Sequence, residues 1–342
     1  MRKLLIGFMV LLVIGTALYF RFRAPRGPIE VAYAGNRTVA IWSTTAQVRE
    51  IVATASFGDR LDVLKRSQDQ ARVRTANGTV GWVDQTDLLS ADVWQRAKEL
   101  ESKTATAPVE ARGHTHAISN LRVEAGRDSP RIRQLAKAVA VDLFERKVAE
   151  APPTPGAVQK DTSSDSTPDA DTAPAPVKKE DWWLVRAHTP DQTTVSGWVL
   201  GRFIDLDVPQ PLPDYASAAG VHVVAWFELN HIADANRGMR PQYLLLGNRG
   251  PEGQLCDFTI MRVFTWGGHT QRYETAYVES NLCGKLPVNL TQTSAPGGDA
   301  TFTFEDSSGG AAETRTYRMH QTIVRRVREG GAAPPKRKRS HD

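Results

Sequence analysis

A short motif that occurs twice constrains this chain more than any other feature. Its first copy reads Val73-Arg74, a polar turn, Gly81-Trp82-Val83 and Leu88-Leu89, and its second copy reads Val185-Arg186, Gly197-Trp198-Val199 and Phe203-Ile204. Apolar and polar residues alternate around both copies with the period of two that is typical of β-strands. Because one unit recurs in the same order, the sequence predicts two copies of one small β-fold.

The first copy carries the turn and cap residues that such a fold needs. Short strands are expected at residues 38–42, 61–65, 71–75 and 79–83. Ala76-Asn77-Gly78 lies between the last two and predicts a hairpin, since Asn-Gly tolerates the positive φ of a tight turn. Ser90 is a helix N-cap residue, and an apolar stripe follows it over residues 91–100, so a helix is expected there.

The second copy is interrupted by a polar insert. Strands at 139–144 and 183–186 match two strands of the first copy, but residues 149–180 lie between them. That segment consists largely of Pro, Asp, Thr, Ser and Ala and has no aromatic residue. It cannot bury enough apolar area to offset its ordering entropy, so a disordered loop between two strands of one barrel is expected. Loop closure of this length adds little further cost.

The two copies resemble the bacterial SH3-like (SH3b, SH3 type 3) domains. In the first, Gly58-Asp59-Arg60-Leu61-Asp62-Val63 and the Gly-Trp-Val motif carry the resemblance, although Ala71 replaces the family's usual Trp. In the second, Leu121-Arg122 and Trp183-x-Val185-Arg186 carry it, although the Gly before the strand at 139 is missing. The resemblance covers residues 28–100 and 112–207, insert excluded. It implies two small β-barrels, an exported protein, and binding to cell-wall peptidoglycan or to peptide segments.

Glycine and tryptophan have separate expected roles in these barrels. Gly81 and Gly197 would let one strand approach another at a barrel corner, while Trp82 and Trp198 would fill the core. Successive side chains of a strand point to opposite faces, so Trp182 and Trp183 cannot both face inward and one should be partly exposed. We therefore expect the ligand-binding candidates to be Trp42, Trp182 and Trp183.

The N-terminus predicts attachment to a membrane. Arg2 and Lys3 precede an apolar run over residues 4–20, which Arg21 and Arg23 follow. Residues 1–23 are therefore interpreted as an uncleaved signal anchor, a single transmembrane helix. A signal peptide cut after Gly15-Thr16-Ala17 is the alternative. With a cytoplasmic tail of two or three residues, the bulk of the chain would lie outside the cytoplasmic membrane.

A third β-rich part follows a proline-rich linker at residues 208–214. Within residues 215–330, strands are expected at 221–229, 242–246, 258–266, 271–278, 300–304 and 314–327, joined by glycine-rich turns. This pattern predicts an antiparallel meander that forms a sandwich or a barrel. The chain's two cysteines, Cys256 and Cys283, lie in this part. In an exported protein an even count favours one disulfide, with two buried thiols as the alternative.

No catalytic, metal or cofactor site emerges from the sequence. Both cysteines lie at strand positions, without the helix N-terminus that would activate a thiol, even if His269 or His320 lay nearby. His114 and His116 have no third ligand near them, and Glu274 and Glu279 are explained as surface carboxylates of a strand. No phosphate-binding glycine loop is present. The basic tail, residues 331–342, is interpreted as solvated and disordered, not as a nucleic-acid-binding segment.

These features together favour a non-enzymatic, membrane-anchored envelope protein. Its tandem SH3-like domains would bind peptidoglycan or a protein of the envelope. One alternative is an envelope hydrolase with its active site in the third part and the repeats for targeting, and another is a structural spacer. The sequence leaves the oligomeric state open.

The anchor predicts a definite orientation. Protease added to spheroplasts should degrade everything beyond about residue 23, because a short cytoplasmic tail leaves the rest of the chain outside. Full protection of the chain against the added protease would instead mean a cytoplasmic protein.

Overall fold

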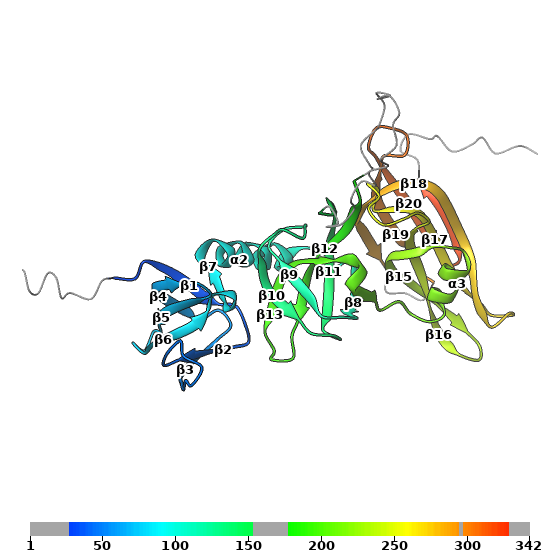
Figure 1. Ribbon diagram of the computed structural model, residues 1–342. Helices are drawn as coiled ribbons and strands as arrows, with labels where there is room; N and C mark the ends of the chain where they lie inside the picture. Colours follow the sequence, from blue (N-terminus) through cyan, green and yellow to red (C-terminus); the bar gives the residue numbers. More distant parts are fainter. Residues whose placement is uncertain (1–26, 153–176, 294–296, 328–342) are drawn as a thin grey trace, which may run out of the picture. The chain divides into compact units, whose positions relative to one another are not determined.

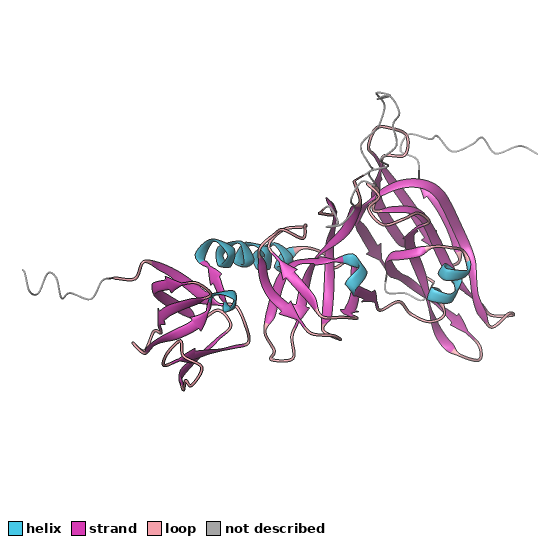
Figure 2. Ribbon diagram, in the orientation of Figure 1, coloured by secondary structure: helices cyan, strands magenta, loops and turns pink. Residues whose placement is uncertain are grey.

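A computed structural model of the chain describes residues 27–152, 177–293 and 297–327. The described residues form mainly antiparallel β-structure, arranged in three sheets of seven strands each (Figures 1 and 2). Two α-helices accompany them, α2 (Ala91–Thr106) and α3 (Leu212–Ala218). The chain divides into two compact units between Gln95 and Arg96, so the first sheet belongs to one unit and the other two sheets to the second.

The first sheet has the strand order β3-β2-β6-β5-β4-β1-β7. Its interior is a cluster of aliphatic residues that alternate along the strands, among them Val39, Ile41, Leu61, Val63 and Val73. Its strands are β1 (Glu30–Ala34), β2 (Thr38–Trp42), β3 (Ile51–Ser56), β4 (Arg60–Ser67), β5 (Gln70–Arg74), β6 (Val80–Asp84) and, after the 3-10 helix η1 (Gln85–Asp87), β7 (Leu88–Ser90).

The second sheet repeats this arrangement strand for strand. Its order is β10-β9-β13-β12-β11-β8-β14, in which each strand has the place of its counterpart seven positions earlier in the first sheet. The repeat predicted from the sequence is therefore also a repeat of topology. The strands are β8 (Ala111–Thr115), β9 (Ser119–Arg122), β10 (Arg131–Leu135), β11 (Ala140–Glu150), β12 (Lys179–His188), β13 (Thr194–Leu200) and, after η2 (Gly201–Phe203), β14 (Ile204–Leu206).

The glycines of the repeated motif lie where two strands come close together. A Cβ on Gly81 would lie 2.5 Å from Cγ2 of Ile41 and 2.7 Å from the carbonyl oxygen of Trp42. At Gly197 a Cβ would lie 2.6 Å from Cγ of Leu121 and 2.8 Å from the carbonyl oxygen of Arg122. Only glycine fits at either position, because the facing strand occupies the space of a side chain.

The tryptophans of the motif differ between the two copies. Trp82 is only partly buried, which corrects the expectation that it fills the core: Gly81 and Val83 face inward on β6, so the residue between them faces outward. Trp198 also lies between two inward-facing residues, but it is 3% exposed. It packs in an outer cluster with Trp182, Leu184 and Leu200, to which Leu100 of α2 adds.

The turn, the helix N-cap and the helix predicted near the end of the first repeat are confirmed. Gly78 has φ +84° and the Thr75–Thr79 backbone pair closes the hairpin between β5 and β6. The Ser90 hydroxyl accepts a hydrogen bond from the Val93 amide, 3.2 Å away, as an N-cap does. Helix α2 continues six residues beyond the predicted end.

Several predicted segments fall partly or wholly outside the described residues. The signal anchor at 1–23, the basic tail at 331–342 and most of the insert lie there. The ends of the insert are described, and they are strand: β11 and β12 pair from Ala140↔His188 to Glu150↔Lys179. The predicted loop at 149–180 was therefore too long at both ends, although it does join neighbouring strands. In the ranges that the structure describes, no helix is long and apolar enough to span a membrane.

The third sheet is the predicted meander, with strands β15 to β21 in sequential order. Its described strands form one continuous sheet. Its strands are β15 (His222–Asp234), β16 (Gly238–Asn248), β17 (Phe258–Gly267), β18 (Arg272–Gln292), β19 (Ala300–Asp306), β20 (Glu313–His320) and β21 (Ile323–Val327). The strand predicted at 314–327 is a hairpin that turns at Gln321, where φ is 51°.

Helix α3 corrects the predicted linker at 208–214. The helix begins at Leu212, which is fully buried, and Pro213 fits its first turn because that turn needs no amide donor. Leu212 and Ala216, one turn apart, pack on Leu245 and Phe264 of the third sheet.

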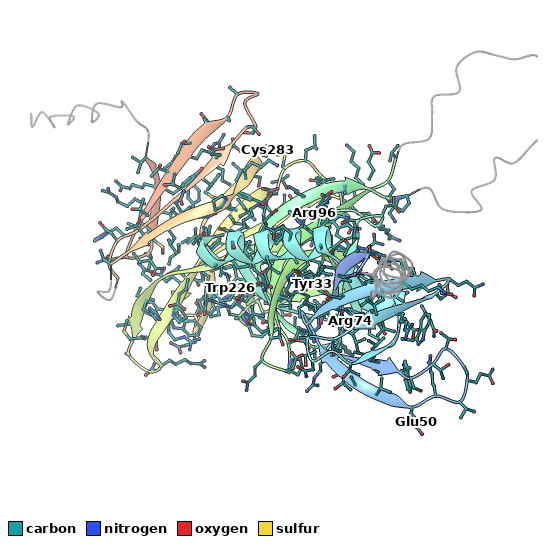
Figure 3. The ribbon with its side chains drawn as sticks, turned by 90° about the vertical axis from the view of Figure 1, so that its left-hand side faces the viewer. Tyr33, Glu50, Arg74, Arg96, Trp226 and Cys283 are labelled. Carbon is teal, nitrogen blue, oxygen red and sulfur yellow. A yellow bond between two sulfur atoms is a disulfide. The ribbon has the colours of Figure 1, made fainter. Side chains whose placement is uncertain are left out.

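The predicted disulfide is confirmed. Cys256 and Cys283 are bonded to each other, so the chain's only two cysteines are both used. The bond joins the segment before β17 to the middle of β18, where Figure 3 labels Cys283.

The close approach at Gly81 predicts a specific loss of stability. Gly81→Ala should lower the free energy of unfolding by about 1–3 kcal/mol, because the added methyl overpacks the contact with Ile41. Urea denaturation measures it. Gly27→Ala is the matched control, since a Cβ there meets no described heavy atom within 4 Å. Equal stability of the two variants would contradict the packing argument.

Candidate functional site

A buried arginine joins the second and third sheets. Arg146 of β11 is 2% exposed, and its guanidinium Nη2 lies 2.5 Å from Oδ1 of Asp181 on β12. Its Nη1 lies 3.2 Å from Oδ1 of Asp257, which precedes β17. The same guanidinium donates to the carbonyl oxygens of Gln254 (2.9 Å) and Cys256 (3.2 Å). A buried cation is thus satisfied by two carboxylates and two carbonyls, which fix the segment before β17 against the second sheet.

Hydrogen bonds and close contacts of the backbone also hold the segment before β17 in place. The Gly253 amide donates to Oδ1 of Asp181, 3.0 Å away. Gly253 has φ +87°, and a Cβ there would lie 2.6 Å from the Lys179 carbonyl oxygen, so only glycine allows this approach. The Leu286 amide donates to Oδ2 of Asp257 at 3.0 Å. The two sheets therefore meet through main chain as well as side chains.

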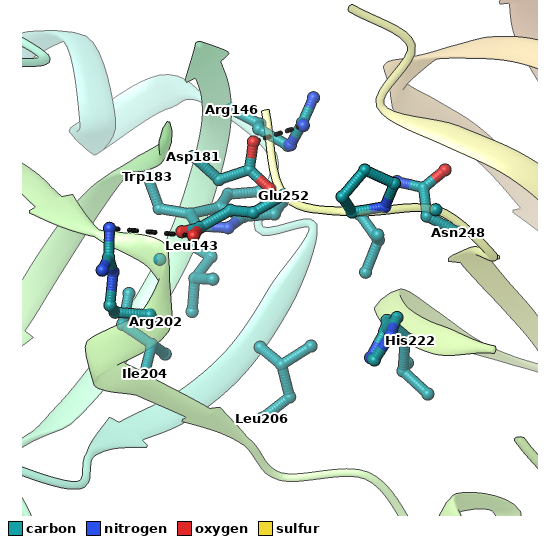
Figure 4. Close-up of a pocket in the computed structure, with 15 residues that line it drawn as sticks. Leu143, Arg146, Asp181, Trp183, Arg202, Ile204, Leu206, His222, Asn248 and Glu252 are labelled. Atoms are coloured by element: carbon teal, nitrogen blue, oxygen red, sulfur yellow. Dashed lines mark hydrogen bonds and ion pairs between the residues drawn. The ribbon is translucent and has the colours of Figure 1, made fainter. Parts of the chain in front are cut away.

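A cavity of about 490 Å³ lies beside this ion pair, between the second and third sheets. We call it the inter-sheet cavity. Figure 4 shows Leu143, Trp183, Ile204 and Leu206 on its apolar side. Polar groups face it from Arg202, Glu252, His222 and Asn248, and Gly250 and Pro251 also line it. Its size and its mixture of an aromatic wall with a few polar groups are typical of small-ligand sites.

Charges of both signs are held in place at one end of the inter-sheet cavity. Glu180 is buried and accepts two hydrogen bonds from Arg127, at 2.8 and 2.7 Å. Arg202 donates to the same carboxylate, and its Nη2 lies 3.7 Å from Oε2 of Glu252. Burial opposes ionisation of Glu180, but the bonds from Arg127 and the charge of Arg202 outweigh it, so the pKa of this carboxyl is below its ordinary value. Arg202 is therefore oriented, yet its side chain still faces the cavity.

The expectation that Trp182 or Trp183 is partly exposed was wrong. They are 2% and 7% exposed. They do point to opposite faces of β12, but both faces are covered. Trp182 packs in the outer cluster with Trp198, and Trp183 faces the inter-sheet cavity. The reason is that the third sheet packs against the second and covers Trp183, which the sequence of the strand alone does not show.

Trp42, the other candidate, lies in the first unit. It is partly exposed, stands opposite Trp82 in the strand register, and has the guanidinium carbon of Arg49 4.3 Å from its ring centroid. It is not a wall of the inter-sheet cavity.

Residues that the sequence analysis set aside have ordinary partners. His114 pairs with Asp207 at 2.9 Å and His116 with Asp205 at 3.4 Å, and each of these side chains is between 41% and 57% exposed. Glu274 accepts from the Thr270 hydroxyl, whereas Glu279 accepts from Arg315, Tyr277 and Tyr317. Within the described ranges, no group of three or more His, Cys, Asp or Glu side chains is placed to hold a metal ion.

A second cavity, of about 390 Å³, lies at the same junction and is lined by a buried carboxyl group, that of Glu110. Glu110 is 1% exposed. Its Oε2 accepts from the Val288 amide at 3.1 Å, while its Oε1 has no partner among the described residues. Burial raises the pKa of Glu110 to about 7, and the bond from Val288 only partly offsets this rise.

The sequence analysis missed Arg146, Arg202, Glu252 and Glu110. Arg146 stands in the charged run Glu145-Arg146-Lys147, and a register shift between Leu143 and Glu145 hides which face of the strand it occupies. No signal marks the others, because their partners come from distant parts of the chain.

Comparison with known proteins yields little likeness. No family model and no curated protein matches the chain. Among solved structures, it is similar to the structure of NlpC2 from Trichomonas vaginalis, with 10% sequence identity and a TM-score of 0.17 over 89% of this chain and 97% of that one. A likeness at that TM-score carries no argument about fold or function.

The raised pKa of Glu110 predicts a pH dependence of stability. The folded state keeps a proton that the unfolded state, with the ordinary pKa of 4.5, releases, so stability is full below pH 4.5 and falls until about pH 7. Glu110→Gln should remove this fall and be more stable than wild type at pH 8 by on the order of 2 kcal/mol. Thermal melts from pH 4 to 8 measure it.

Glu145→Gln is the control for this experiment. The Lys103 ion pair and Lys147 lower the pKa of Glu145 against the effect of its burial, so this variant should not gain stability as pH rises. Identical pH profiles for wild type and Glu110→Gln would contradict the assignment.

Proposed function

We propose that the protein is a non-enzymatic, membrane-anchored envelope protein that binds peptidoglycan through its second SH3-like domain. The inter-sheet cavity is the observation that carries this proposal. Peptidoglycan presents sugar rings and short peptides with both ammonium and carboxylate groups. The indole of Trp183 offers an apolar face for a ring, while Arg202 and Glu252 offer one charge of each sign.

The assignment to SH3-like barrels rests on two supports. The residues of the motif resemble that family, and the first and second sheets share one strand order. The resemblance implies wall binding, and tandem copies would raise avidity over the affinity of a single site. In the first copy the partly exposed Trp42 beside Arg49 would be the contact surface.

Membrane attachment rests on the sequence alone. Residues 1–23 lie outside the described ranges, so the apolar run from 4 to 20 between basic residues is the support for the anchor. The confirmed disulfide agrees with an oxidising compartment outside the cytoplasm.

The alternative of an envelope hydrolase would need a nucleophile other than cysteine. Cys256 and Cys283 are bonded to each other, which leaves neither thiol free to become a thiolate. A structural spacer, the other alternative, predicts no binding by any part of the chain.

A binding experiment tests the proposal. The full chain is titrated with purified muropeptides and sedimented with intact peptidoglycan. Arg202→Gln and Glu252→Gln should each weaken muropeptide binding about tenfold, since each removes a charged contact worth about 1.5 kcal/mol or more. The side chains of Arg202 and Glu252 are 35% and 31% exposed, and Arg127 still donates two hydrogen bonds to Glu180 in both variants, so the fold should persist.

Arg112→Gln is the matched control, because Arg112 lies on the same sheet, exposed and paired with Asp142 at 3.5 Å. Absence of binding by the wild type would refute the proposal. Equal losses in Arg202→Gln and Arg112→Gln would show that net charge and not the inter-sheet cavity is responsible.

A further inference from the structure

Two arginines line a small groove on the third sheet, apart from the inter-sheet cavity. Its volume is about 310 Å³. Arg262 lies in the middle of β17, opposite Leu245 of β16 and Val278 of β18, and Arg249 follows the end of β16. We call this the arginine groove. Its lining residues are Ala216, Ala219, Val221, Leu245, Arg249, Ile260, Arg262, Phe264 and Val278.

The floor of the arginine groove is apolar and firmly packed. Leu245, Ile260 and Phe264 are buried and belong to the cluster beneath α3. The side chain of Tyr215 in α3 stacks on Phe264 with ring centroids 5.7 Å apart. Ala216 and Ala219, on the side of α3, are small, so the space above the floor stays open.

The charge in the arginine groove is not neutralised by the protein. Arg262 donates from Nε to the hydroxyl of Thr275 at 2.8 Å and lies over the ring of Phe264, but neither partner is an anion. Arg249 is exposed and has no hydrogen bond or ion pair to any described residue. Burial, and then the charge of Arg249, lower the pKa of Arg262. Two guanidiniums that repel each other above an apolar floor are favourably placed for an anion.

We infer that the arginine groove binds the carboxyl terminus of a peptide that ends in a small apolar residue. The carboxylate would lie between Arg249 and Arg262, since a guanidinium matches a carboxylate with two parallel hydrogen bonds. The last side chain would rest on Leu245, Ile260 and Phe264. The volume lies at the low end of the range of roughly 300–1,000 Å³ for ligand sites, which suits one or two small residues. This inference does not rest on the proposed function.

The full chain titrated with N-acetyl-alanyl-alanine tests the inference, with the C-terminal amide of the same dipeptide as the ligand control. The acid should bind and the amide should bind at least about tenfold more weakly, because the amide cannot accept a charge-assisted pair of bonds. Arg249→Gln and Arg262→Gln should each weaken binding of the acid about tenfold. Arg272→Gln changes an exposed arginine of β18 that does not line the arginine groove, so it is the matched control and should bind as the wild type does.

The Ala219→Phe variant and inorganic phosphate as a second ligand test the apolar floor and the charge separately. Ala219→Phe keeps both arginines but fills the space beside α3, so it should abolish binding. Because Arg249 is exposed, the Arg249→Gln variant should fold normally, so its binding can be measured even if Arg262→Gln is destabilised. Equal binding of acid and amide, no binding of the acid, or inorganic phosphate binding as tightly as the dipeptide would each overturn the inference. The last result would mean a general anion site with no use for the apolar floor.

Discussion

The arrangement of the second compact unit depends on the buried guanidinium of Arg146. Burying a cation costs several kcal/mol unless its donors are satisfied, and here Asp181 of β12 and Asp257, just before β17, supply opposite charge. Removing either carboxylate would leave the buried guanidinium with less opposite charge, so these ion pairs hold the two sheets in one relative position. The segment before β17 is fixed by the same carboxylates through the amides of Gly253 and Leu286. The inter-sheet cavity exists because that segment lies over the face of β12 that carries Trp183.

The junction combines three kinds of constraint that act on adjacent residues. Cys256 of the disulfide is the neighbour of Asp257, and Gly253, where the backbone approaches Lys179 closely, lies three residues before Cys256. Glu110 accepts a hydrogen bond from the Val288 amide of β18, the strand that also carries Cys283. A mobile loop at this place would leave the cavity wall undefined. A rigid wall favours binding, because less entropy is lost when the ligand is ordered. The second sheet thus gains a site that the first copy, which has no third sheet in its unit, does not have.

Local chemistry made part of this fold predictable. The duplicated motif, the Asn77-Gly78 turn, the Ser90 cap, the meander and the disulfide all follow from residues close in sequence or from composition, and the structure contains each of them. The predictions of tryptophan burial were wrong for one reason: the sequence does not show which elements pack against each other. Trp82 was expected in the core and one of Trp182 and Trp183 partly exposed, yet Trp82 faces outward on β6 and the third sheet covers the face of β12 that carries Trp183. The site itself joins residues 146, 181, 202 and 252, and a register shift at Leu143 hides the face of Arg146. No periodicity argument brings these together.

Amide hydrogen exchange of the full chain, with wild type compared with Arg146→Leu, tests whether Arg146 holds the second and third sheets together. The amides of Gly253, Leu286 and Val288 should be protected in the wild type about as well as those of the β11–β12 pair, since each donates to a carboxylate at the junction. In Arg146→Leu these three amides should lose protection while the first sheet stays unchanged. Rapid exchange of the three amides in the wild type would contradict the account, because the second and third sheets would then not form one rigid site.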